Sequence, residues 1–393
     1  MDTKDNNQDK NLLIKISDSD IAKSDTEKDI LKDELLKTKQ KMKFWAIIGA
    51  ALLLTSIVLS VFVYYLLAVD NKSAKASQKP LSSLVNTEGG EPALNTENMA
   101  RRLLDGVYVE KGKENIFPIA FMIDNHVDAR PQAGLEKAQL IIEAEAEGGI
   151  TRYLAVFASD EDLEKIGPIR SARPYFIDWA KELSALYVHV GGSPDALAKM
   201  IKENTLHINE FYNGEYFWRG TDFVAPHNVF TSREKMSEYL AGKELETGKF
   251  FEWKFKDDAK KEDVGTSSSI SIDYVIPDYV VRWQYKADTN NYTRYLGGKK
   301  HLTVNDTELI AKNVIIQYVK GEVLDEAKRQ SFEHIGTGKA LVCLDGFCYK
   351  GTWKKKSAEA RTRFYTENDE EFEFNAGKIW VEVVKPWYTV KIE

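Results

Sequence analysis

The sequence has 393 residues, a formal net charge of −7 and a hydrophobic fraction of 43%, enough for a packed core and for two domains. This acidic balance excludes a general nucleic-acid-binding protein, because such proteins are usually basic. Any site for an anion must therefore be local, and no nucleic-acid partner is expected.

The N-terminal part of the chain indicates a membrane anchor. Residues 1–43 are polar and charged, whereas residues 44–69 carry no charge. A helix of about 20 apolar residues crosses a bilayer, so this segment predicts a single transmembrane helix in contact with lipid. Lysines are denser before the segment than after it, which predicts a cytoplasmic tail and an extracytoplasmic remainder at the plasma membrane. The alternative is a cleaved signal peptide, since Ala74, Lys75 and Ala76 resemble a cleavage site.

An α/β domain is expected after a linker. Residues 70–98 are rich in Ser, Asn, Lys and Gly, which predicts a flexible linker. Residues 99–247 alternate apolar runs with helical patterns, which is typical of α/β domains. We expect a short helix at 135–140, a helix at 171–186, and strands at 116–123, 139–145, 151–158 and 186–190. Ser193 before Pro194 has the form of a helix N-cap.

The pattern changes to β-strands over residues 248–393. Short runs rich in β-branched and aromatic residues alternate with turn-rich spacers, which predicts a β-rich domain of the sandwich or barrel kind. The two cysteines, Cys343 and Cys348, flank the dipeptide Asp345-Gly346, which favours a two-residue hairpin turn. Such a turn sets the cysteines opposite each other, so a cross-strand disulfide is feasible and agrees with an extracytoplasmic location. Two half-buried thiols are the alternative.

Several phrases occur in a recognisable order along the chain: DNHVDARPQAGLEKA (124–138), EAEAEGGITRYLAVF (143–157), IGPIRSARPYFIDWA (166–180), YVHVGGSPDA (187–196), PHNVFTS (226–232) and DGFCYKGTWKK (345–355). Over about residues 101–385 the chain resembles the YerB-like family of bacterial envelope lipoproteins, a family of unknown function. The resemblance implies an extracytoplasmic location, an α/β N-terminal part and a β C-terminal part, with no established activity. Because no cysteine precedes Cys343, the lipid attachment of the family cannot be carried over.

Single arginines lie within or beside apolar runs, which points to an anion site. Arginine stays charged when buried, and its planar fork fits carboxylate or phosphate oxygens. A glycine turn before a helix N-terminus offers backbone N–H groups to the same kind of ligand, and a polar loop adds a histidine and an asparagine. The predicted ligand-binding residues are Arg130, Arg152, Arg170, Arg173, Gly191, Gly192, Ser193, His227 and Asn228.

Carboxylates of the chain are the alternative partners for these arginines. Glu143, Glu145 and Glu147 are spaced by two and would share one face of a strand. Because like charges repel, such a row needs arginines, water or a cation, so a weaker alternative is a metal site of Asp124, Glu143 and Glu145. No H-E-x-x-H, G-x-S-x-G or C-x-x-C motif occurs. The sequence therefore names no catalytic residue and no cofactor, apart from Mg²⁺ under the metal alternative.

Three functional hypotheses follow from these patterns. The first is a membrane-anchored extracytoplasmic protein whose arginine-lined cleft binds an anionic cell-envelope ligand, such as a wall polymer. The second is a metal-assisted phosphotransferase acting on wall-polymer precursors, because the LytR–CpsA–Psr type of phosphotransferase has a similar architecture. The third is a non-catalytic envelope scaffold in which the arginines pair internally and the chain binds a protein partner. The sequence leaves open whether the protein is an enzyme.

Overall fold

The computed structural model describes residues 96–266 and 268–393, and the segment Pro92–Glu393 forms one compact unit. The predicted cytoplasmic tail, the predicted transmembrane helix at 44–69 and nearly all of the predicted linker lie outside the described residues. Within the described ranges, no helix is long and apolar enough to cross a membrane.

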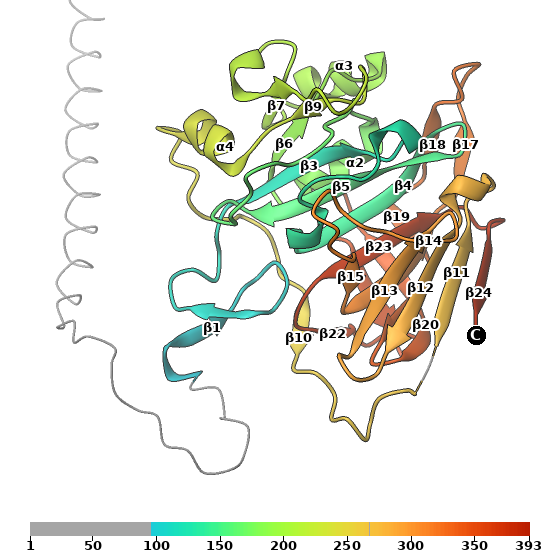
Figure 1. The fold of residues 1–393 in the computed structure, drawn as a ribbon. Coiled ribbons are helices and arrows are strands. Elements are labelled where there is room, and N and C mark those ends of the chain that lie inside the picture. The colour runs from blue at the N-terminus through green and yellow to red at the C-terminus, as the bar shows by residue number, and fades with distance from the viewer. Residues whose placement is uncertain (1–95, 267) are drawn as a thin grey trace, which may run out of the picture. The chain divides into compact units, whose positions relative to one another are not determined.

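A ten-stranded mixed sheet forms the centre of the fold (Figure 1). Its inner strand β4 pairs antiparallel with β5 and parallel with β23, so strands from before and after residue 248 are direct neighbours. In spatial order the strands are β21 (Arg363–Thr366), β20 (Phe347–Lys355), β19 (Gly336–Leu344), β16 (Asn313–Tyr318), β23 (Ile379–Val384), β4 (Leu140–Glu147), β5 (Ile150–Ala158), β3 (Pro118–Asp124), β6 (Leu186–His189) and β7 (His207–Asn209).

Smaller sheets and short helices surround this sheet. A six-stranded sheet contains β14 (Lys299–Lys300), β13 (Asn291–Leu296), β12 (Val281–Lys286), β11 (Ser269–Asp273), β24 (Thr389–Ile392) and β15 (Ile310–Ala311). Two-stranded sheets pair β1 (Met99–Arg101) with β2 (Tyr108–Glu110), β8 (Trp218–Arg219) with β9 (Val229–Phe230), β10 (Lys254–Lys256) with β22 (Glu373–Asn375), and β17 (Gly321–Val323) with β18 (Gln330–Phe332). The helices are α2 (Pro174–Lys181), α3 (Pro194–Lys202), α4 (Arg233–Leu240), and the 3₁₀ turns η1 (Thr96–Asn98), η2 (Val127–Ala129), η3 (Leu135–Lys137), η4 (Gly214–Tyr216) and η5 (Pro277–Tyr279).

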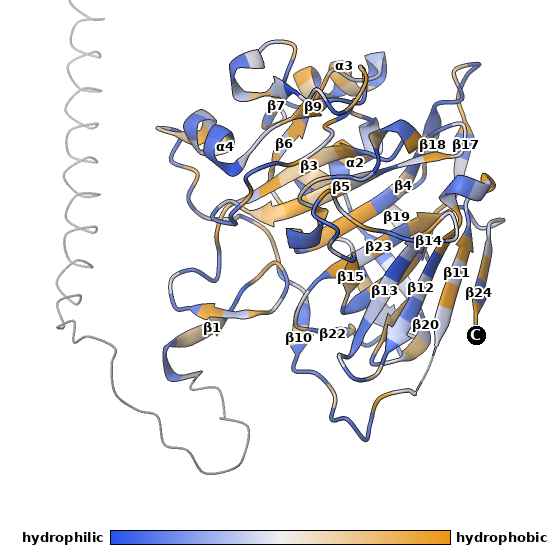
Figure 2. Cartoon of the chain, viewed as in Figure 1, coloured by the Kyte–Doolittle hydropathy of each residue, from blue (hydrophilic) through white to orange (hydrophobic). Residues whose placement is uncertain are grey.

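Two hydrophobic cores lie on the two faces of the ten-stranded sheet. Phe121 of β3 belongs to the core that includes Trp283 of the six-stranded sheet. Its neighbour Met122 belongs to the other core, together with Phe176 and Trp179 of α2. Successive side chains of a strand point to opposite faces, so β3 is covered on both sides. Figure 2 shows the resulting concentration of hydrophobic residues on β3 and β6.

The expectation of an α/β domain followed by a β-rich domain is wrong, because the described residues form mostly β-sheet. Their α-helices have only 8 or 9 residues, and no α-helix separates the strands β3, β4 and β5, which pair antiparallel. Continuous apolar runs are typical of parallel strands buried on both faces. Here the same runs arise in a mixed sheet, in which β3 and β4 each pair antiparallel with β5 on one side and parallel with another strand on the other. The runs are continuous because helices cover one face of the sheet and a second sheet covers the other.

Local elements agree more closely with the sequence. The strands expected at 116–123, 139–145, 151–158 and 186–190 correspond to β3, β4, β5 and β6. Ser193 caps α3, and its Oγ accepts a hydrogen bond of 3.3 Å from the Ala196 N–H. The helix expected at 171–186 is shorter, because the chain stays extended until Pro174, with Ala172 bridged to Gly192.

A disulfide joins Cys343 of β19 to Cys348 of β20, with a Cα–Cα distance of 4.1 Å. The two cysteines are directly opposite in the strand register. Asp345 and Gly346 form the turn between them with φ values of 53° and 77°. Positive φ at both central residues is the requirement of the type I′ hairpin, which explains a glycine at the second position.

Removal of this disulfide should lower the free energy of unfolding by only about 2 kcal/mol, because closing so short a loop removes little entropy from the unfolded chain. The sequence separation of the two cysteines is 5. Denaturant unfolding of the double variant Cys343→Ser/Cys348→Ser beside the wild type measures this difference. A loss twice as large would mean that the bridge has a role in the folded state beyond limiting the unfolded chain.

Candidate functional site

Three of the four predicted arginines come together where β3 and β4 end and β5 begins. Arg152 of β5 lies opposite Asp124, the last residue of β3. An extended segment after residue 166 runs beside the end of β3 and carries Arg170 and Arg173 to the same place. With Glu147 at the end of β4, these residues form what we call the arginine cluster: Asp124, Glu147, Arg152, Arg170 and Arg173.

Two carboxylates face the three guanidinium groups of the cluster. Glu147 forms ion pairs with Arg152, at 2.5 Å, and with Arg173. Asp124 Oδ2 lies 3.1 Å from Arg170 Nε. Burial, followed by the charge of Arg173, lowers the pKa of Arg152 to about 10, although Glu147 and Asp124 act in the opposite direction. Because three guanidinium groups share two carboxylates, one positive charge of the cluster has no carboxylate to balance it there.

Several guanidinium donors of the cluster have no hydrogen-bond partner within residues 96–266 and 268–393. The Nε atoms of Arg152, Arg170 and Arg173 are all buried without one. Arg152 and Arg173 use their terminal nitrogens on Glu147 and on main-chain carbonyls. The guanidinium of Arg170 forms no hydrogen bond with these parts of the chain, and its side chain is 22% exposed. Arg170 is thus the arginine best placed to meet a ligand from solvent.

His227 lies at the edge of the arginine cluster. Its Nδ1 is 2.7 Å from Asp124 Oδ2, and the His126 backbone N–H donates to Asp124 Oδ1 at 2.9 Å. Burial alone would raise the pKa of Asp124, but these hydrogen bonds and the charges of Arg152 and Arg170 together lower it. An ionised carboxylate only accepts hydrogen bonds, so His227 donates from Nδ1, and in the neutral ring the lone pair is on Nε2.

The fourth arginine, Arg130, has its partners elsewhere. Its guanidinium donates to the main-chain carbonyl of Asn125, at 3.0 Å, and to that of Asp278, at 2.9 Å. The same group lies over the ring of Tyr279, 4.6 Å from its centroid. These contacts tie the segment after β3 to η5, so Arg130 has a clear role within the fold.

The predicted glycine turn and Asn228 also make internal contacts. The Gly191 N–H donates to Asn209 Oδ1 at 2.8 Å, and the Ser193 N–H donates to a main-chain carbonyl at 3.2 Å. Two of the N–H groups expected to hold an anion are therefore used by the protein, with Gly192 between them. Asn228 Oδ1 accepts a hydrogen bond of 3.0 Å from Arg219.

The expected row of glutamates on β4 is divided between the two faces of the sheet. Arg152 lies opposite Ala144 in the strand register, so it does not share a face with Glu143 and Glu145. The register shifts between Glu145 and Glu147, and Glu147 reaches Arg152. This irregularity explains why only the last glutamate of the row belongs to the arginine cluster.

The other two glutamates have cationic partners of their own. Glu143 pairs with Arg294 at 2.5 Å, and Glu145 pairs with Lys385 at 2.7 Å. Asp124, the third member of the metal alternative, contacts Arg170. Each carboxylate named for that metal site is therefore engaged within the fold.

An open groove lies away from the arginine cluster, along β19, β20 and β21, with a volume of about 1260 Å³. Its lining includes the lysines Lys339, Lys350 and Lys354, together with Glu367 and Asp369. Charges of both signs are mixed along it, and no residue of the arginine cluster lines it. The groove therefore favours no ligand of a particular charge.

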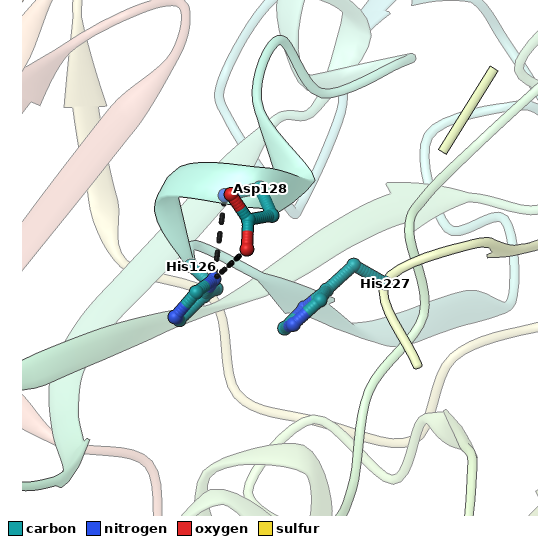
Figure 3. A group of neighbouring side chains, drawn as sticks. All are labelled: His126, Asp128 and His227. Carbon is teal, nitrogen blue, oxygen red and sulfur yellow. Dashed lines mark hydrogen bonds and ion pairs between the residues drawn. The ribbon is translucent and has the colours of Figure 1, made fainter. Parts of the chain in front are cut away.

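The sequence interpretation missed His126 and Asp128. Both follow β3 directly, within the stretch DNHVD. The ring of His126 stacks on that of His227, with centroids 4.4 Å apart and an interplanar angle of 14° (Figure 3). The available signal was a histidine between two aspartates at the end of an expected strand.

Comparisons with known proteins identify the family. Residues 104–246 match the model "Protein of unknown function (DUF3048) N-terminal domain", and residues 270–381 match the C-terminal domain of the same family. The putative lipoprotein YerB of Bacillus subtilis (strain 168) is 28% identical over 309 residues, which cover 77% of this chain and 91% of that protein. The crystal structure of the YerB protein from Bacillus subtilis has a TM-score of 0.66 and 26% sequence identity, covering 74% of this chain and 99% of that chain. The resemblance to YerB is thus confirmed, and the chain belongs to the DUF3048 family of proteins of unknown function.

Proposed function

We propose that this chain is an envelope-associated protein that binds a carboxylate or phosphate group of a cell-envelope ligand at the arginine cluster. The envelope location rests on the relative YerB, which is named a putative lipoprotein. The observation that carries the binding proposal is the imbalance of charge in the cluster, where three guanidinium groups face two carboxylates. A bound anion would compensate the remaining positive charge.

Arg170 is the proposed contact residue. Its guanidinium is partly exposed and forms no hydrogen bond within the described part of the chain. The planar fork of arginine donates two parallel hydrogen bonds to a carboxylate or phosphate, and such charge-assisted bonds are stronger than neutral ones. Arg152 and Arg173 are more deeply buried, with 3% and 9% of their side chains exposed. They add a positive field rather than direct contacts, because Glu147 and main-chain carbonyls already engage their terminal nitrogens.

Binding is favoured over a metal-assisted phosphotransferase. The carboxylates that would hold Mg²⁺ in that alternative, Asp124, Glu143 and Glu145, each have a cationic partner in the fold. The scaffold alternative agrees with the pairing of Arg152 and Arg173 with Glu147. It does not account for the partly exposed guanidinium of Arg170, which is ion-paired with Asp124 but forms no hydrogen bond within the described residues.

Inorganic pyrophosphate, used as a probe, should stabilise the full-length wild-type protein and should not stabilise Arg170→Gln. A ligand at 100 times its dissociation constant adds about 2.7 kcal/mol to the free energy of unfolding. Thermal unfolding of both proteins over a pyrophosphate titration measures the effect. The control is Arg282→Gln, since Arg282 is exposed on β12 and donates a hydrogen bond to Gln284. This variant should respond as the wild type does.

Two results would overturn the proposal. One is equal stabilisation of the wild type and Arg170→Gln, which would place the anion elsewhere. The other is the absence of any shift with pyrophosphate, phosphate or a carboxylate peptide, together with strong destabilisation of Arg152→Gln and Arg173→Gln. That combination would make the arginines structural.

A further inference from the structure

We propose a separate site for a divalent transition-metal ion of the Zn²⁺ type, formed by His126, Asp128 and His227. One ligand atom from each of these side chains lies within 4.8 Å of the others, and Figure 3 shows the three side chains next to one another. Two imidazole nitrogens and one carboxylate oxygen form a donor set that Zn²⁺ accepts, with coordination positions left open. The inference does not rest on the proposed anion binding, because none of these ligands belongs to the arginine cluster.

The local fold brings the first two ligands together. His126 is the N-cap of η2, and Asp128 lies within that turn, so both ligands come from one short segment of the chain. His126 Nδ1 and Asp128 Oδ2 are 3.4 Å apart. Two ligand atoms of a tetrahedral Zn²⁺ ion, each about 2.0–2.1 Å from the metal, are separated by roughly 3.3 Å. The observed separation therefore suits two donors that share one ion.

The electrostatics of this pair also favour a cation. The Asp128 backbone N–H donates to His126 Nδ1 at 3.3 Å, so this nitrogen carries the lone pair when the ring is neutral. The same nitrogen lies 3.4 Å from Asp128 Oδ2, and ligation of an ion by Nδ1 would replace its contact with the backbone N–H. Two negative ends at this distance repel each other, and a bound cation would remove the repulsion.

A carboxylate orients the ring of His227, as is common for histidines that bind metals. Metal-bound histidines usually donate their other ring N–H to a carboxylate, which orients the ring and strengthens the ligand. Asp124 accepts this hydrogen bond from His227 Nδ1 at 2.7 Å and is itself held by the backbone N–H of His126. The carboxylate is buried, with 2% of its side chain exposed, whereas His227 is 13% exposed. The free Nε2 is therefore the nitrogen available to an ion.

Closure around an ion requires a small movement of His126. The rings of His126 and His227 are almost parallel, and parallel rings do not point their lone pairs at one atom. The side chains of His126 and Asp128 are 31% and 67% exposed, so both have room to rotate while His227 stays fixed by Asp124.

The test is a calorimetric titration of the full-length protein with ZnCl₂, repeated with Co²⁺ as an absorbing probe. The wild type should bind one ion per chain, and Co²⁺ should show the visible bands of a tetrahedral site. Asp128→Asn and His126→Gln should each raise the dissociation constant at least tenfold. Asp124→Asn, which removes the carboxylate that orients His227 and leaves the three proposed ligands in place, should raise the dissociation constant about 10–100-fold.

His207→Gln is the matched control. His207 Nδ1 lies 3.0 Å from His189 Nε2, so this variant removes a histidine from the other close histidine pair and leaves the proposed ligands intact. Its zinc affinity should equal that of the wild type. The inference is overturned if the wild type binds no zinc, if His126→Gln and Asp128→Asn bind as tightly as the wild type, or if His207→Gln loses the site instead. Since Arg170→Gln keeps all three ligands, retention of zinc in that variant separates this site from the anion site.

Discussion

Replacing Glu182 by glutamine should lower the free energy of unfolding by about 3–5 kcal/mol, because it leaves two buried cations without their counter-charge. Glu182 caps the C-terminal end of α2, with 1% of its side chain exposed. It pairs with Lys355 at 2.7 Å and with Arg361, and it accepts hydrogen bonds from Thr362. Burial would raise the pKa of Glu182, but Lys355 and Arg361 lower it, so the carboxylate is charged at neutral pH.

Chemical denaturation followed by tryptophan fluorescence measures this loss, since the guanidinium carbon of Arg361 lies 3.6 Å from the centroid of the Trp253 ring. The control is Glu203→Gln. Glu203 also lies between two cations, Lys181 and Lys199, but its side chain is 28% exposed, and partly exposed pairs contribute about 0–1 kcal/mol. Equal losses in the two variants would contradict the expected dependence on burial.

The variant Glu182→Gln also tests whether the parts of the chain before and after residue 248 unfold together. Glu182 precedes residue 248, whereas Lys355 and Arg361 follow it, and the ten-stranded sheet contains strands from both parts. We therefore expect Glu182→Gln to unfold in one transition at a lower denaturant concentration. Two separate transitions would show that the parts unfold independently.

The free energy of unfolding should decrease as the pH rises from about 4.5 to about 8, because of Glu382. Burial, followed by the charge of Glu143, raises the pKa of Glu382 to about 8, although Arg294 opposes this effect. Tyr274 and Trp283 donate hydrogen bonds to its two oxygens. The folded protein thus holds the Glu382 proton more tightly than the unfolded chain does. The resulting stability is fully present below the pKa that Glu382 has in the unfolded chain. It is lost as the pH rises through the pKa that Glu382 has in the folded protein.

The slope should be on the order of 1 kcal/mol per pH unit between these two values. Glu382→Gln stays neutral at every pH and keeps nearly the same shape, so its stability should lack this component. Urea unfolding of the wild type and the variant across this pH range, at constant salt, provides the comparison. Identical pH dependence in the two proteins would mean that Glu382 is already ionised in the folded state at neutral pH.

The local elements could be predicted from the sequence, because each of them depends on residues that are close together in the chain. Ser193 before Pro194 predicted the start of α3, and Asp345-Gly346 predicted the turn that sets Cys343 opposite Cys348. The apolar runs predicted the inner strands. They did not predict the pairing of these strands, because a strand covered on both faces has the same apolar pattern in a parallel and in an antiparallel sheet.

The candidate site was predicted in part. Arg152, Arg170 and Arg173 were named from the sequence and lie together, whereas Arg130 has partners elsewhere. The partner of Arg152 and Arg173 could not be chosen among the three glutamates, because the register shift after Glu145 leaves no mark in the residue types. His126 and Asp128 were missed because their relation to His227, about 100 residues away, exists only in the folded chain.

The sequence by itself determined the family, the short-range caps and turns, and the apolar segments that become strands, since these depend on residue identity and on neighbours along the chain. Only the tertiary structure decided which charges meet. Glu182 and Lys355 are 173 residues apart, and Glu143 and Arg294 are 151 apart. Such pairs form because burial makes an uncompensated charge costly, so folding brings an opposite charge to each site from wherever the sheet topology supplies it.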